Sequence, residues 1–183
     1  MDAVISIERA LATPDLRWPF PPELQWLAER AAEHRVIVEI GSYQGRSTVA
    51  MAANTPGVVY AMDDWYGPRD DFGMKDDDRI GLFARFLRNV DGLPVRALRC
   101  DHANAGTALP LDVVPDMVFI DGDHGYEGAR RDIETWKQRI APGGLLCGHD
   151  RDHWGVRKAL DHCLLGWTIV GPNTTLWKWT KGV

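Results

Sequence analysis

Short runs of β-branched and apolar residues alternate with segments of helical periodicity along most of this chain. The runs lie at 36–40, 58–62, 95–98, 117–120 and 145–147. Runs of this length and composition, most of them ended by Gly or Asp, are typical of buried strands. Strands separated by helices pair in parallel, because a parallel crossover needs a dozen or more residues. The pattern therefore predicts an α/β fold with a mainly parallel sheet.

Apolar residues at helical spacing fill the intervals between these runs. We expect helices over 23–34 and 47–53, and three more with apolar faces Ile80/Phe83/Leu87/Val90, Tyr126/Ala129/Ile133/Trp136/Ile140 and Val156/Leu160/Cys163. The segment around the prolines at 14, 19, 21 and 22 is expected to be irregular. Two closing strands, 167–170 and 175–179, have no helix between them, so they can pair only as an antiparallel hairpin.

The length of 183 residues and the average composition, 45% hydrophobic and 26% charged, favour one globular domain. We expect an N-terminal helical segment over 1–35 and a core over 36–181. The net charge of −5 shows no excess of basic residues of the kind that favours binding to nucleic acid or to an anionic membrane surface. No membrane-length apolar run or signal-peptide pattern is visible, so a cytoplasmic location is expected. The three cysteines form neither a disulfide framework nor a zinc pattern.

The loops after the first three strands carry the first candidate site residues. Gly41 and Gly45 are spaced so that the backbone can pass close to a ligand and start a helix. Asp63, about twenty residues on, can accept hydrogen bonds from ribose hydroxyls. Asp101 can accept one from an adenine amino group. Together they favour a nucleoside cofactor; the alternatives are a tight turn without a ligand, a solvated cap at Asp63 and a helix N-cap at Asp101.

The loops after the fourth and fifth strands carry several acids and histidines. If these strands are neighbours, Asp121, His149 and Asp150 surround one small volume, with Asp123 and His124 at its rim. Acids that meet at one point repel unless something neutralises them, and a divalent cation would do so. Such a cation could also hold a substrate hydroxyl and lower its pKa. The alternative is a set of helix caps and turn residues.

An acidic stretch over 63–78 contains Asp70, Asp71, Asp76, Asp77 and Asp78. It lacks the pattern of a calcium-binding EF-hand loop. A mobile lid over the substrate and a plain solvated loop both remain open for it.

These motifs together resemble a known family. Residues 38–48, VEIGSYQGRST, are similar to motif I of class I S-adenosylmethionine-dependent methyltransferases. Residues 119–126, FIDGDHGY, resemble the IDGDHSY signature of the small-molecule O-methyltransferase group that includes the macrocin, mycinamicin and novobiocin enzymes. Further motifs follow in the family order up to 176–179. The resemblance covers about 36–181 and implies a Rossmann-like sheet of seven strands, the last antiparallel, with helices on both faces.

The resemblance also implies an S-adenosylmethionine site. Its pocket would be lined by Glu39, Gly41, Ser42, Tyr43, Gly45 and Ser47. Asp63 would bind the ribose hydroxyls, Asp101 and His102 would lie near the adenine, and Asp121 would face the sulfur.

Metal-dependent members of this group hold magnesium through an acid after the fourth strand and two polar residues after the fifth. Those positions are Asp121, His149 and Asp150, and the catalytic base of such relatives falls at Asp123 or His124. His149 departs from the usual Asp or Glu, and imidazole suits softer metals than magnesium. Magnesium, a softer metal, no metal, and His149 as the base all remain open.

The expected function is methyl transfer from S-adenosylmethionine to a hydroxyl oxygen of a sugar or phenol, with His124 or Asp123 accepting the proton. Three alternatives stay open. A nicotinamide-dependent dehydrogenase is disfavoured by the missing GxGxxG. A non-haem iron oxygenase would use His124, His149 and a carboxylate from Asp121 or Asp150. A catalytically silent cofactor-binding protein is the third. The acceptor stays unidentified, and a homodimer is the base-rate expectation for assembly.

Overall fold

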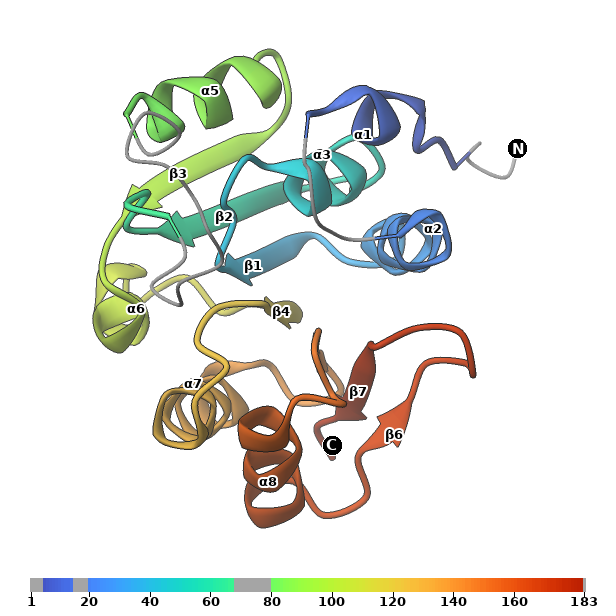
Figure 1. Ribbon diagram of the computed structural model, residues 1–183, viewed down its shortest axis with the longest axis vertical. Coiled ribbons are helices and arrows are strands. Elements are labelled where there is room, and N and C mark those ends of the chain that lie inside the picture. Colours follow the sequence, from blue (N-terminus) through green and yellow to red (C-terminus); the bar gives the residue numbers. More distant parts are fainter. Residues whose placement is uncertain (1–4, 15–19, 68–79, 183) are drawn as a thin grey trace.

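The computed structural model describes residues 5–14, 20–67 and 80–182, which form a sheet in the order β3-β2-β1-β4-β5-β7-β6 (Figure 1). The strands are β1 (Val36–Ile40), β2 (Val58–Asp63), β3 (Val95–Arg99), β4 (Met117–Ile120), β5 (Leu145–Gly148), β6 (Thr168–Ile169) and β7 (Trp177–Thr180). Strands β1 to β5 pair in parallel, whereas β7 runs antiparallel to both of its neighbours. The predicted α/β fold and its closing hairpin are confirmed.

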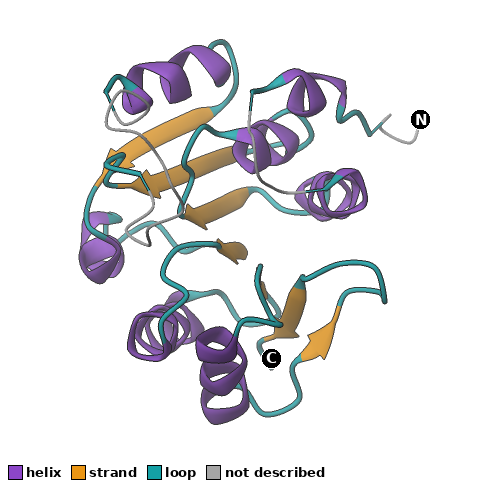
Figure 2. Ribbon diagram, in the orientation of Figure 1, coloured by secondary structure: helices purple, strands orange, loops and turns teal. Residues whose placement is uncertain are grey.

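Helices cover both faces of this sheet (Figure 2). One face carries α1 (Glu8–Ala12), α2 (Pro21–Ala31), α3 (Arg46–Ala52) and α5 (Leu82–Asn89). The other carries η1 (His102–Asn104), α6 (Ala105–Ala108), α7 (Tyr126–Arg139) and α8 (Trp154–Cys163). Helix α1 lies ahead of the proline segment that we expected to be irregular; residues 15–19 of that segment lie outside the described residues, and α2 begins at Pro21. Within the described ranges, every helix is too short or too polar to cross a bilayer.

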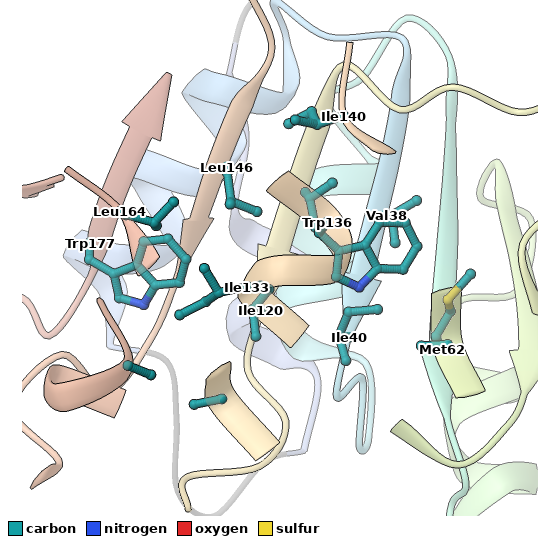
Figure 3. Packing of buried hydrophobic residues seen from close by; sticks show 14 of the residues in the cluster. Val38, Ile40, Met62, Ile120, Ile133, Trp136, Ile140, Leu146, Leu164 and Trp177 are labelled. Atoms are coloured by element: carbon teal, nitrogen blue, oxygen red, sulfur yellow. The ribbon is translucent and has the colours of Figure 1, made fainter. Parts of the chain in front are cut away.

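The core between α7 and the sheet is centred on Trp136, whose side chain is fully buried. Figure 3 shows its ring beside Val38 and Ile40 of β1, with Ile133 of α7 and Ile140, which directly follows α7, in the same cluster. The predicted apolar face of this helix is therefore confirmed. Packing α7 here places its N-terminus at the carboxyl ends of β1 and β4.

The predicted apolar face of α5 is confirmed only in part, because Val90 is buried and Phe83 packs against the core but the other two residues do not. Ile80 and Leu87 are 71% and 45% exposed, whereas Leu82 and Phe86 are buried. The helix starts after Gly81, which has φ 76, and it packs against α3 and β2 through its i, i+4 pair. The segment has apolar residues on more than one side, and docking onto the sheet decides which of them are buried.

The acidic stretch considered as a lid lies mostly outside the described residues, and so do Asp70, Asp71, Asp76, Asp77 and Asp78. Its first aromatic residue, Trp65, is 3% exposed and packs its ring 4.5 Å from that of Phe83.

Candidate active site

The glycine turn after β1 lies directly against the loop after β4. The N–H of Gly41 donates to the carbonyl of Met62 (2.9 Å), and that of Asp121 donates to the carbonyl of Ile40 (2.8 Å). Gly41 has φ 87, and a Cβ there would lie 2.1 Å from the carbonyl oxygen of Asp121. Only glycine fits this position, because both the left-handed backbone and the close approach exclude a side chain.

The carboxylate of Glu39 is fully buried and is held by three hydroxyl groups. Oε2 accepts hydrogen bonds from Ser42 (2.7 Å) and Thr48, and Oε1 accepts one from Ser47 (2.5 Å). Burial raises the pKa of Glu39 to about 7, outweighing these hydrogen bonds, and the charge of Asp121 adds to the rise. The observed partners of Glu39 and Ser47 stabilise the turn. Their contact with a cofactor stays a prediction.

Asp63, at the end of β2, is tied to the same turn. Its Oδ2 accepts the N–H of Tyr43 (2.8 Å), and its Oδ1 accepts that of Trp65 (2.6 Å). The indole N–H of Trp65 donates to the carbonyl of Tyr43 (3.0 Å). Tyr43 and Trp65 have φ 44 and 53, a conformation that costs energy in residues other than glycine and that clusters at functional sites. Asp63 therefore lies next to the turn, as expected, and Trp65 is a support that sequence reasoning missed.

Asp101 follows β3, and the N–H of Cys100 donates to the carbonyl of Asp63 (3.0 Å) to bring the two strand ends together. The carboxylate of Asp101 is exposed and accepts the N–H of Ala103 (2.9 Å), so it has the capping role left open above. His102 begins η1, and its side chain lies outside the described residues. The adenine contacts of Asp101 and His102 stay predictions.

Imidazole and carboxylate groups alternate in a row behind this edge. Nε2 of His124 lies 2.8 Å from Oδ2 of Asp150, and Nδ1 of His149 lies 3.2 Å from the same oxygen. On its other edge, Nε2 of His149 lies 3.2 Å from Oε2 of Glu23. The side chains of His124 and Asp150 are 26% and 32% exposed, whereas those of His149 and Glu23 are 2% and 0% exposed. We call these four residues the acid–base row; it runs from His124 at the surface to Glu23 in the interior.

The charges in this row stabilise one another. Burial by itself would lower the pKa of His149, but Asp121, Asp150 and Glu23 outweigh it and raise that pKa to about 11. Burial would raise the pKa of Asp150, but hydrogen bonds from His124 and His149 hold it well below its usual range. The pKa of Glu23 is lowered against the effect of burial, chiefly by its hydrogen bond with His149. The row therefore contains an internal positive charge between carboxylates.

Three of the described residues could share a metal ion. Asp121, His124 and Asp150 each place one ligand atom within 4.8 Å of the others. The predicted set had His149 in place of His124, and the structure brings those three residues together: Nδ1 of His149 lies 3.2 Å from Oδ2 of Asp150 and 3.7 Å from Oδ1 of Asp121. The ring of His149 is buried, however, and its Nε2 edge faces Glu23, so His124 is the imidazole that shares the more exposed set with the two acids. Two carboxylate oxygens and an imidazole nitrogen do not fit magnesium, which prefers oxygen ligands in near-octahedral geometry. They suit manganese, iron or zinc better.

Asp123 has a structural partner at the start of α7. Its Oδ1 accepts the N–H of Gly125 (2.8 Å), and a Cβ on Gly128 would lie 2.1 Å from its Oδ2. The carboxylate thus closes a turn that opens the helix. A catalytic role for Asp123 stays a prediction.

Sequence reasoning missed Glu23 and Thr175. Thr175 Oγ1 lies 2.7 Å from Nε2 of His149, and its N–H donates to Oε1 of Glu23 (2.8 Å). Glu23 had a signal, because it shares a helical stripe with buried Leu27 and Ala31 at i+4 and i+8, where a charged residue is unusual. Thr175 had none, since its place depends on how the loop before β7 folds against β5.

Comparison with known proteins identifies one matching sequence family and several solved structures with a similar fold. The family described as "Methyltransferase domain" matches residues 38–151, more than half of the chain. The structure is similar to a Klebsiella pneumoniae protein provisionally described as an O-methyltransferase (TM-score 0.68, 19% identity, 96% of this chain and 88% of that one). It is also similar to cofactor-bound Rv0187 from MTB (TM-score 0.69, 18% identity, 96% of this chain and 87% of that one). A third similar structure is that of an rRNA methylase from Streptococcus thermophilus (TM-score 0.61, 16% identity, 93% of this chain and 100% of that one). At these identities the likeness shows a shared fold.

Proposed function

The chain belongs to the methyltransferase-domain family, and on that premise we propose that it transfers the methyl group of S-adenosylmethionine to a hydroxyl oxygen of a small molecule. The observation that carries the proposal is the His124–Asp150 pair, whose Nε2 and Oδ2 lie 2.8 Å apart at the edge where Gly41 meets Asp121. A base next to a cofactor turn is what deprotonation of a hydroxyl nucleophile requires.

The glycine turn, Asp63 and Asp101 are the groups proposed to bind the cofactor, with ribose hydroxyls at Asp63 and adenine near Asp101 and His102. The bound cofactor supplies an electrophilic methyl group on its sulfonium. The protein must then orient the acceptor oxygen in line with that methyl, which can lower the barrier by roughly 7–11 kcal/mol in favourable cases. The backbone contact between Gly41 and Asp121 supports this role, because it places the proposed cofactor turn and the proposed acceptor loop directly against each other.

His124 is the residue proposed to accept the hydroxyl proton. The contact between Nε2 of His124 and Oδ2 of Asp150 orients the imidazole, as a carboxylate does for the histidine of other acid–base pairs. A neutral imidazole is well suited to this task near neutral pH. Asp123 is the second candidate, although its Oδ1 already accepts the N–H of Gly125 at the start of α7.

The proposal includes an alternative in which a divalent metal ion, and not a free His124 side chain, activates the hydroxyl. A manganese-like or zinc-like ion would be held by Asp121, His124 and Asp150, and it would lower the pKa of a bound hydroxyl. Such an ion would occupy His124, so the metal and base roles exclude each other.

The family membership leaves the dehydrogenase and oxygenase alternatives without support. The similar rRNA methylase keeps an RNA acceptor as a second candidate. The net charge of −5 favours a small molecule, because RNA-binding enzymes usually need a basic surface. A cytoplasmic location, with neither nucleic acid nor membrane as partner, belongs to the same proposal.

Two measurements test the proposal. Calorimetry with S-adenosylhomocysteine is expected to show micromolar binding that Asp63→Ala abolishes, while the neighbouring Asp64→Asn retains it. Methyl transfer is then assayed with phenols, sugars and RNA, and mass spectrometry is expected to find an O-methyl product. Absence of binding to the wild type overturns the cofactor assignment. Binding without turnover on any acceptor favours a catalytically silent protein, and an N-methylated RNA product favours the second candidate.

A further inference from the structure

We infer that Glu23 of α2 is a positioning residue for His124, acting through His149 and Asp150. The inference rests on the proposed function only in giving His124 the proton-accepting role. Glu23 lies outside the matched residues 38–151, in the N-terminal segment.

The carboxylate of Glu23 is fixed by donors on both of its oxygens. Oε1 accepts the N–H of Thr175 (2.8 Å) and its hydroxyl (3.3 Å). Oε2 accepts the N–H of Phe20 (3.0 Å) and faces Nε2 of His149 (3.2 Å). The side chain is 0% exposed, so rotating it would leave buried donors unpaired, which is costly.

These contacts fix the ring of His149. Thr175 Oγ1 lies 2.7 Å from Nε2, on the same edge as Glu23. The main chain of His149 is held as well, since its N–H donates to Ile120 (3.0 Å) and its carbonyl accepts the indole N–H of Trp177 (3.1 Å). With backbone and Nε2 both held, Nδ1 faces the two acids at the strand ends, 3.2 Å from Oδ2 of Asp150 and 3.7 Å from Oδ1 of Asp121.

Asp150 transmits this orientation to the surface. Its Oδ2 is shared between Nδ1 of His149 and Nε2 of His124. Asp150 has φ 57, a conformation that its own backbone does not favour and that the surrounding contacts must maintain. If the His149 ring turned, Asp150 would lose one of its two imidazole partners. The contact between Asp150 and Nε2 of His124 would then shift, and the orientation of the His124 ring would change.

The first test follows the imidazole rings directly. Long-range ¹H–¹⁵N spectra of the histidines are recorded on the full-length chain and on Glu23→Gln and Thr175→Val. Thr175→Ser keeps the hydroxyl, and Glu29→Gln makes the same change elsewhere on α2; both serve as controls. We expect the ring signals of His149 and His124 to shift in the first two variants and to stay at their wild-type positions in the controls. Folded Glu23→Gln and Thr175→Val proteins with unchanged His124 signals would overturn the inference.

The second test separates positioning from binding. Once an acceptor is known, Glu23→Gln and Thr175→Val are expected to lower kcat by up to about 100-fold with an unchanged KM for S-adenosylmethionine. Wild-type kcat in both variants contradicts the inference. If Glu23→Gln does not fold, Thr175→Val carries both tests, because it removes one oxygen at nearly constant volume. Failure of the wild type to bind S-adenosylhomocysteine would overturn the proposed function and leave the ring spectra to decide on Glu23.

Discussion

Gly41 faces the main chain of Asp121 so closely that a Cβ on Gly41 would lie 2.1 Å from the Asp121 carbonyl oxygen. This contact joins the cofactor turn after β1 to the loop after β4, which carries the proposed base His124. The two motifs far apart in the sequence therefore form one backbone unit, and a displacement of either changes the distance between cofactor and base.

Gly41→Ala is expected to destabilise the protein by about 2–4 kcal/mol, from the left-handed backbone and the clash with Asp121 together, and to weaken S-adenosylhomocysteine binding. Gly92→Ala is the matched control, because Gly92 has φ 72 and nothing lies within 4 Å of its Cβ position. That control should cost only about 1–2 kcal/mol. Urea unfolding measures both. Equal stability of the two variants would show that the Gly41 contact is not tight.

Glu39→Gln should remove a pH dependence of stability. The pKa of Glu39 is raised from 4.5 to about 7 in the folded state, so its contribution is fully present below pH 4.5 and is lost as the pH rises through 7. At about 1.4 kcal/mol per pKa unit, the loss is on the order of 3 kcal/mol. We expect the free energy of unfolding of the wild type to fall by that amount relative to Glu39→Gln between pH 4.5 and 8. A pH-independent difference would contradict the raised pKa.

His124→Asn should lower kcat by about 10²–10⁴-fold, the usual contribution of a general base. S-adenosylhomocysteine affinity should not change, because the proposed cofactor contacts lie elsewhere. His162→Asn serves as the control, since His162 contacts the hydroxyl of Tyr126 (2.6 Å) near the end of α8. Wild-type turnover in His124→Asn would transfer the proton-accepting role to Asp123, and Asp123→Asn then tests that assignment.

Metal removal should leave turnover within about twofold of the untreated enzyme, because the proposed base needs His124 without a metal on it. Added zinc or manganese should inhibit by competing for Asp121, His124 and Asp150. Rates are measured after chelator treatment and again after each ion is added back. If the chelator abolished activity and one added ion restored it, the result would favour metal activation of the hydroxyl over proton acceptance by His124.

Much of this fold could be predicted from the sequence, because strands and helices are encoded by local periodicity. The glycine turn, Asp63 and Asp121 could be placed at one sheet edge for the same reason, since each ends or directly follows a buried strand. The buried face of α5 could be predicted only in part, through Phe83 and Val90. Its segment carries apolar residues on more than one side, and contact with α3 and β2 selects Leu82 and Phe86.

The sequence by itself determined which residues stand at the strand ends, and the tertiary structure decided how they are used. His149 and His124 were both predicted near Asp150, with His149 as the metal ligand. Glu23 and Thr175, 126 and 26 residues away from His149 in the chain, hold its Nε2 edge in the interior. His124 therefore joins Asp121 and Asp150 at the surface. No local pattern encodes that exchange, because the orientation of a buried ring depends on partners that only folding brings together.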